Sequence, residues 1–116
     1  MKPLIIIPTY NERENIEPLV NDVLGRYQAV EVLVVDDNSP DGTGDAVTKM
    51  KSQNPRVHLL SRPGKQGLGK AYLAGFKWGL DKGYDRFVEM DADFSHRPED
   101  LGKLLEASQD RDVVIG

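Results

Sequence analysis

The sequence contains no cysteine, which excludes a disulfide framework and a thiolate metal site. It also contains no long hydrophobic run, since the apolar residues 4–7 are too few for a signal peptide or a membrane span. The chain also has no excess of positive charge, and its net charge of -4 argues against a nucleic-acid partner. We therefore expect a protein from a reducing compartment, with no transmembrane segment in this chain.

The chain has 116 residues, of which 39% are hydrophobic and 29% charged, as expected for one domain with one core. Short apolar runs at 4–7, 30–35, 57–60, 85–90 and 112–116 predict five strands. The segments between them have helical spacing of apolar residues. Alternating strands and helices predict an α/β fold with a parallel sheet, right-handed crossovers and three α/β/α layers.

The first two helices have recognisable start and stop signals. Pro18 is tolerated only in a first helical turn, so the first helix is expected to begin near Glu14 or Asn15 and to end at Gly25. Asp41 is a good N-cap for a second helix that continues to about Gln53.

Small residues dominate one face of the third predicted helix. Gly75 and Gly79 lie one turn apart on it, and we interpret them as positions where the helix packs closely against the sheet. Trp78 is interpreted as a packing residue rather than a stacking platform. A fourth helix is expected to begin at Pro98.

Acidic and aromatic residues follow three of the predicted strands. Tyr10 and Glu12 follow the first, Asp37 follows the second, and Asp91 and Asp93 follow the fourth. Parallel strands bring these ends to one edge of the sheet, where ligands bind in open α/β folds. Two adjacent carboxylates repel each other unless a cation lies between them, and oxygen ligands suit Mg²⁺ or Mn²⁺. The alternative is that both aspartates only cap a turn and a helix.

This edge has the groups that a nucleoside diphosphate requires. Asp37 and Glu12 can accept hydrogen bonds from ribose hydroxyls or base N–H groups, and Tyr10 can stack on or cover the base. A metal at Asp91 and Asp93 would stabilise a leaving diphosphate.

A glycine-rich basic loop precedes the third predicted helix. Its cations Arg62, Lys65 and Lys70 could add positive charge at a diphosphate, although each also fits a solvated surface residue. The stretch 64–70 nearly matches a P-loop, but the next residue is Ala71, which lacks the hydroxyl that should bind Mg²⁺. The acidic pair at 36–37 is similar to that of a receiver domain, but it closes the second strand instead of the first.

Four blocks together resemble the inverting GT-A glycosyltransferases, and among them the dolichyl-phosphate (polyprenyl-phosphate) mannose synthases. They are Ile6–Glu12, Val35–Thr43, Gly67–Ala71 and Glu89–His96, in the family's order. The resemblance implies a Rossmann-like GT-A nucleotide-binding half with strand order 3-2-1-4-5. It also implies metal-dependent transfer of mannose from GDP-mannose to a polyprenyl phosphate, with inversion.

The resemblance further implies roles for particular residues. Asp91 and Asp93 would be the catalytic residues, and with Ser95 they would hold Mg²⁺ or Mn²⁺. The nucleotide sugar would be bound by Pro8, Tyr10, Glu12, Val35, Asp37, Asp91, Ala92 and Asp93.

Members of this family continue beyond the fifth strand. By resemblance, residues 1–116 are therefore expected to form a single nucleotide-sugar-binding domain, a truncated GT-A catalytic domain. Full-length relatives would act in the cytoplasm, peripherally at the cytoplasmic face of a membrane. An alternative is a fragment that binds GDP-sugar or metal without transferring; a P-loop hydrolase is a further alternative. The apolar fifth strand would be an open edge, which predicts a possible homodimer.

Overall fold

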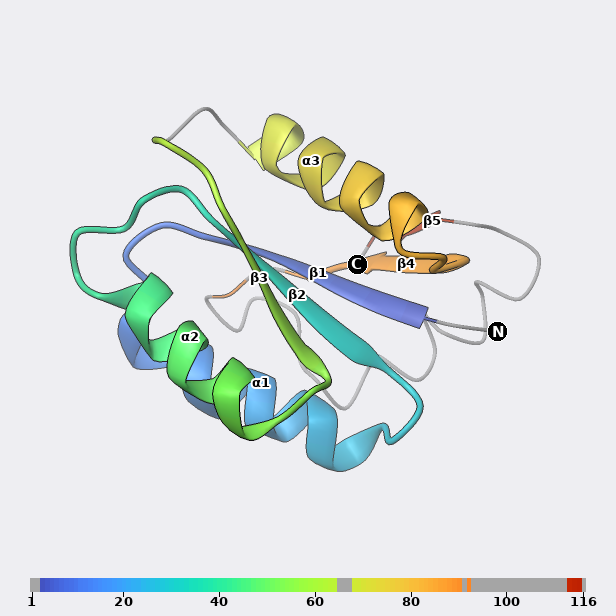
Figure 1. Ribbon diagram of the computed structural model, residues 1–116, viewed down its shortest axis with the longest axis horizontal. Helices are drawn as coiled ribbons and strands as arrows, with labels where there is room; N and C mark the ends of the chain where they lie inside the picture. Colours follow the sequence, from blue (N-terminus) through green and yellow to red (C-terminus); the bar gives the residue numbers. More distant parts are fainter. Residues whose placement is uncertain (1–2, 65–67, 91, 93–112, 116) are drawn as a thin grey trace.

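The fold is an α/β sandwich built on a parallel sheet, as Figure 1 shows for the computed structural model. The structure describes residues 3–64, 68–90, 92 and 113–115. The sheet order is β3-β2-β1-β4-β5, and every pairing is parallel, which confirms the predicted order and fold class. The elements are β1 (Pro3–Thr9), α1 (Arg13–Arg26), β2 (Glu31–Asp36), α2 (Thr43–Gln53), β3 (Val57–Ser61), α3 (Leu68–Asp81), β4 (Arg86–Glu89) and β5 (Val113–Ile115).

Helices cover both faces of the sheet, so the predicted three layers are present. Helices α1 and α2 lie together on one face, and α3 lies on the other (Figure 1). The central strand β1 is buried along its whole length and supplies both cores. Ile5 and Ile7 pack in the core with α1 and α2, whereas Leu4 and Ile6 pack in the core with α3. This alternation follows from the two-residue period of a strand.

Helix α1 begins within one residue of its predicted start and extends one residue past its predicted end. It begins at Arg13 and ends at Arg26, so Pro18 lies in its second turn and Gly25 inside it. Proline removes one backbone donor there, which leaves the carbonyl of Glu14 without its helical partner. Glu14 and Pro18 are both exposed, so water can bond that carbonyl and the helix continues through the proline.

Helix α3 packs closely on the sheet, as its two glycines predicted. A Cβ atom on Gly75 would lie 2.8 Å from Ile6 Cγ2, and one on Gly79 would lie 2.4 Å from Phe87 Cε1. Both positions are buried. Any side chain there would force the helix away from β1 and β4, so the packing interpretation of both glycines is confirmed.

Two expectations cannot be followed further along the chain. The helix expected at Pro98 lies outside the described residues. Strand β5 is at one edge of the described sheet, but self-association through it stays a prediction. Within the described ranges, no helix combines the length and apolarity needed to cross a membrane.

Candidate functional site

The carboxyl ends of β1 and β2 lie side by side, which brings the first two predicted site loops together. Thr9 pairs with Asp36 at the end of the ladder, and the Asp37 N–H extends it by donating to the Thr9 carbonyl at 3.1 Å. On the other side of β1, the Met90 N–H donates to the Ile6 carbonyl at 3.0 Å. The chain therefore leaves β4 beside the same edge.

The Asp36 carboxylate connects the two loops at this edge by hydrogen bonds, so it is not available to a ligand. Its Oδ1 accepts hydrogen bonds from Thr9 Oγ1 at 2.7 Å and from Ser39 Oγ at 2.6 Å. Its Oδ2 accepts from the Ser39 N–H at 3.1 Å. The side chain is buried, with 3% exposure. Sequence reasoning gave Asp36 no role, because both partners are recognisable only after β1 and β2 pair.

The loop that follows β1 is tied to the loop that follows β2. The backbone N–H of Asn11 donates to Ser39 Oγ at 2.9 Å, and the Glu12 N–H donates to Thr43 Oγ1 at 3.1 Å. The Arg13 N–H donates to Asp41 Oδ2 at 3.1 Å. Arg13 is the first residue of α1, so the bond to Asp41 satisfies the first helical N–H, while the other two bonds fix the two residues before the helix.

Asp41 organises the start of both helices. It was predicted as the N-cap of α2, but Gly42 takes that position with a left-handed φ of 91°. The carboxylate instead accepts from the Thr43 N–H at 3.0 Å and from Thr43 Oγ1. Desolvation acts to raise the pKa of Asp41, but the hydrogen bonds from Thr43 and Arg13 outweigh it and hold the pKa below its ordinary value.

Tyr10 and Glu12 present their side chains at this edge. Tyr10 is 38% exposed, as expected of a residue that could stack on or cover a base. Glu12 is half-buried, and its Oε2 accepts from Asn15 Nδ2 at 3.1 Å. A polar concavity lies beside them, lined by Asn11, Glu12, Arg13, Glu14, Asn15 and Asp41.

Asp37 is placed differently from the other predicted acceptors. Its side chain is only 7% exposed, and its Oδ1 lies 3.5 Å from Arg62 Nε. Arg62 is itself only 9% exposed, so the interpretation of this arginine as a solvated surface residue is wrong. The pairing requires β2 and β3 to be adjacent, which sequence spacing alone did not reveal.

Three predicted nucleotide-binding residues have buried side chains. Val35 packs under α3, Ala92 packs in the core with α1 and α2, and Pro8 is buried in β1. Only the backbone of these residues can take part in binding. The aspartates at 91 and 93 and the serine at 95 lie outside the described residues, as does Lys65. Among the residues described, no cluster of three or more His, Asp or Glu could hold a metal.

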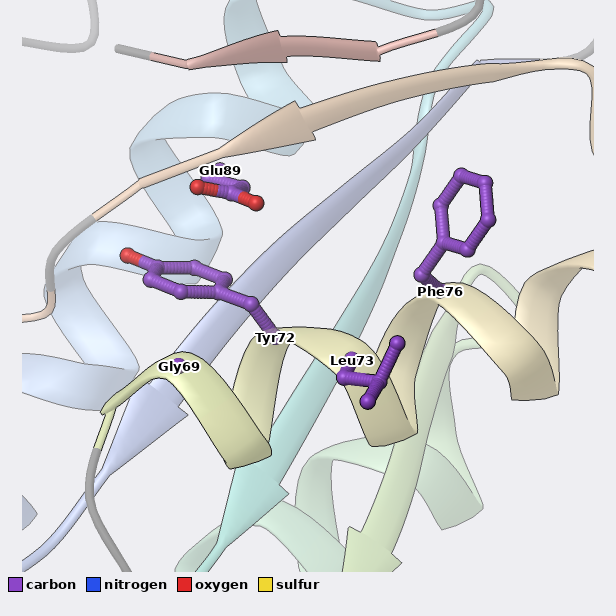
Figure 2. A pocket seen from close by; sticks show the side chains of 5 residues that line it. All are labelled: Gly69, Tyr72, Leu73, Phe76 and Glu89. Atoms are coloured by element: carbon purple, nitrogen blue, oxygen red, sulfur yellow. The ribbon is translucent and has the colours of Figure 1, made fainter.

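A second concavity lies between α3 and β4. Figure 2 shows it lined by Tyr72, Leu73 and Phe76 from the helix and by Glu89 from the strand, with Gly69 at one end. Glu89 is the last residue of β4, so this mostly apolar groove reaches the strand end from which the predicted metal ligands follow.

Sequence comparison identifies related proteins over the whole chain. Residues 4–116 match the protein family described as Glycosyl transferase family 2. The chain is 53% identical over 116 residues to an undecaprenyl-phosphate mannosyltransferase of Micrococcus luteus, covering 100% of this chain and 48% of the relative. It is 43% identical over 119 residues to a dolichol-phosphate mannosyltransferase of Pyrococcus furiosus, covering 100% of this chain and 33% of that protein. The chain thus spans about half or less of these relatives.

Solved structures share the fold. A mannosyltransferase from Pyrobaculum calidifontis, in complex with GDP-Man and Mn²⁺, aligns with a TM-score of 0.77 at 26% identity, over 95% of this chain and 33% of that chain. Glucosyl-3-phosphoglycerate synthase from Mycobacterium tuberculosis aligns with a TM-score of 0.68 at 20% identity, over 90% of this chain and 38% of its own, and supports the fold alone.

Proposed function

Because the chain belongs to glycosyl transferase family 2, we propose that it is the nucleotide-sugar-binding part of an enzyme that transfers mannose from GDP-mannose to a polyprenyl phosphate. The main support is the edge where the loops carrying Tyr10, Glu12 and Asp37 are hydrogen-bonded together. The mannosyltransferase relatives match across the whole chain, site loops included.

The nucleoside would bind over the carboxyl ends of β1 and β2. Tyr10 would cover the base, while Glu12 and Asp37 would accept hydrogen bonds from base or ribose. Pro8, Val35 and Ala92 have buried side chains, so they would contribute backbone groups and the shape of the floor. The hydrogen bonds that Asp36 and Asp41 accept fix both loops, which lowers the entropic cost of ordering them around a ligand.

Asp91, Asp93 and Ser95 would hold a divalent metal at the diphosphate. Their donor set is two carboxylates and a hydroxyl, all oxygen, which fits Mg²⁺ or Mn²⁺. A solved structural neighbour contains GDP-Man and Mn²⁺, which supports Mn²⁺ as the first metal to test. When bound, such a metal supplies positive charge that stabilises the departing diphosphate.

The transfer itself is an in-line displacement. A phosphate oxygen of the acceptor forms a bond to C1 of mannose while the bond from C1 to the diphosphate oxygen of GDP breaks, which inverts the configuration. The acceptor phosphate is already an anion, so no side chain has to remove a proton. The acceptor is a lipid phosphate, so the proposed reaction takes place at a membrane surface.

A second candidate function is nucleotide-sugar binding without transfer. It is favoured by the extent of the match, since the chain spans half or less of the relatives that carry out the reaction. The P-loop alternative has no such support: Ala71, in the first turn of α3, is only 1% exposed and offers no hydroxyl to a metal.

A transfer assay separates these candidates. Radiolabelled GDP-mannose, Mn²⁺ and a polyprenyl phosphate would be incubated with the chain, and label in the lipid fraction measured. Label in the lipid supports the transferase. Binding of GDP-mannose without labelled lipid supports the second candidate. Preferential binding and hydrolysis of ATP with Mg²⁺ would contradict both.

A further inference from the structure

Arg62 is fixed in place by the sheet rather than by its own loop. It follows the last residue of β3, and its N–H donates to the Asp36 carbonyl at 2.8 Å, which extends the pairing of β2 and β3. This bond sets the arginine beside Asp37, the residue after β2. The arginine therefore belongs structurally to the same edge as the predicted nucleoside site.

The side chains of Arg62 and Asp37 form a pair that is largely removed from water. Both are more than nine-tenths buried, and Nε and Oδ1 are 3.5 Å apart. A carboxylate buried to this extent is costly without a compensating cation, and removing one partner of such a pair leaves an uncompensated charge. The arginine thus supplies the opposite charge that a carboxylate buried at this position requires.

The pair leaves hydrogen-bonding capacity unused on the acid. Asp37 Oδ1 is buried and accepts no hydrogen bond from the described residues, because its 3.5 Å distance from Arg62 Nε is longer than that of a normal hydrogen bond. The neighbouring Asp36 is the opposite case, since Thr9 and Ser39 supply three hydrogen bonds to its two oxygens. Asp37 Oδ1 is buried against Arg62, so the other carboxylate oxygen, Oδ2, is the one that would accept a hydrogen bond from a bound nucleoside.

We propose that Arg62 is a positioning residue for nucleotide binding, which compensates the charge of the Asp37 carboxylate and holds it oriented toward N–H or O–H donors of a nucleoside. The inference rests on the proposed function, because it assumes that a nucleoside diphosphate binds at this edge. Under this inference Arg62, the first cation of the basic loop, acts on the nucleoside through Asp37 and does not act on the diphosphate.

A double-mutant cycle tests this role. The affinity for GDP with Mn²⁺ would be measured calorimetrically for wild type, Arg62→Gln, Asp37→Asn and the double variant. We expect each single variant to bind GDP at least about tenfold more weakly, since each loses or misplaces a charge-assisted hydrogen bond. The double variant should lose little more than Asp37→Asn alone, because the arginine acts through the acid. Arg62→Lys should recover part of the loss, and pyrophosphate affinity should not change.

Arg56→Gln is the matched control at the opposite end of the sheet. Arg56 is also a structural arginine, and it donates to the carbonyls of Val30 at 3.0 Å, Leu24 at 3.3 Å and Tyr27. Its replacement should lower Tm without weakening GDP binding.

Three results would overturn the inference: unchanged GDP affinity in a folded Arg62 variant, fully additive losses in the cycle, or an equal loss of pyrophosphate affinity. If Arg62→Gln does not fold, Arg62→Lys in both backgrounds provides the same comparison. Wild type that binds no GDP would instead overturn the proposed function, and the inference with it.

Discussion

Two adjacent aspartates at the end of β2 have separate tasks. The oxygens of Asp36 are used inside the protein, while one buried oxygen of Asp37, beside Arg62, accepts no hydrogen bond from the part of the chain that the structure describes. The sequence pair alone could not show this division. It depends on Thr9, which contacts Asp36, and on Arg62, which contacts Asp37. Both are far away along the chain and become neighbours of these acids only when β1, β2 and β3 pair.

Exchanging each acid for its amide should separate the two tasks. Asp37→Asn is expected to weaken GDP binding about tenfold or more, with little change for pyrophosphate. Asp36→Asn is expected to lower the free energy of unfolding by about 1–3 kcal/mol, because an amide N–H₂ would meet a donor of Ser39 or Thr9. Urea denaturation and GDP titration of both variants provide the test. If both acids gave the same pattern of losses, the division would be wrong.

The hydroxyl of Tyr84 should make the stability of the protein depend on pH, which can be tested without any ligand. Its hydroxyl donates to Glu31 Oε1 at 2.7 Å, and the same oxygen lies 2.7 Å from His58 Nε2. Burial raises the pKa of Tyr84 above its ordinary value, and the Glu31 carboxylate raises it further. The protonated hydroxyl therefore adds stability that is complete below about pH 10, the pKa in the unfolded chain, and is lost as the pH rises above it.

Tyr84→Phe should accordingly change the alkaline limb of the stability curve. The variant should be less stable near pH 7 by roughly 1.5–3 kcal/mol, because a hydrogen bond to a charged acceptor is lost. Between about pH 9.5 and pH 11, its free energy of unfolding should fall less steeply than that of wild type. Chemical denaturation across this range measures both slopes, and parallel curves would show that Tyr84 does not carry the effect.

Among the elements, the apolar runs predicted the positions of the strands well. The local start and stop signals predicted the ends of the helices less well. The runs at 4–7 and 30–35 are buried on both faces, so their composition alone identifies central parallel strands. The start of α1 at Arg13 depends on acceptors from Ser39, Thr43 and Asp41, which no local signal reveals. Helix boundaries set by distant side chains are therefore the part of this fold that sequence patterns miss.

Two glycines in different helices test the packing of α3. Gly79→Ala should destabilise the protein by about 1–3 kcal/mol, since its Cβ would lie 2.4 Å from Phe87 Cε1 and 2.9 Å from Leu4 Cδ2. Gly25→Ala is the control in α1, where nothing lies within 4 Å of the added atom, and it should stabilise by up to about 1 kcal/mol. Thermal denaturation measures both, and a neutral Gly79→Ala would contradict the close contact.

At the scale of the whole molecule, the order of the elements limits where a ligand can bind. Alternating strands and helices predicted the α/β class from residues alone, and the strand order followed from the family resemblance. The order places the ends of β1, β2 and β4 at one edge, with β1 between the other two. The same order could not reveal which acids there are consumed by internal hydrogen bonds, because that depends on individual side-chain geometry.

We propose that this edge binds a nucleoside diphosphate together with a divalent metal. The most direct test is a calorimetric titration of GDP-mannose into the chain with and without Mn²⁺, repeated for Asp93→Ala and for the control Asp81→Ala, an exposed acid at the end of α3. We predict saturable binding that requires Mn²⁺, is lost in Asp93→Ala and is retained in Asp81→Ala. Binding that is equal with and without metal, or equal in Asp93→Ala and wild type, would contradict the account.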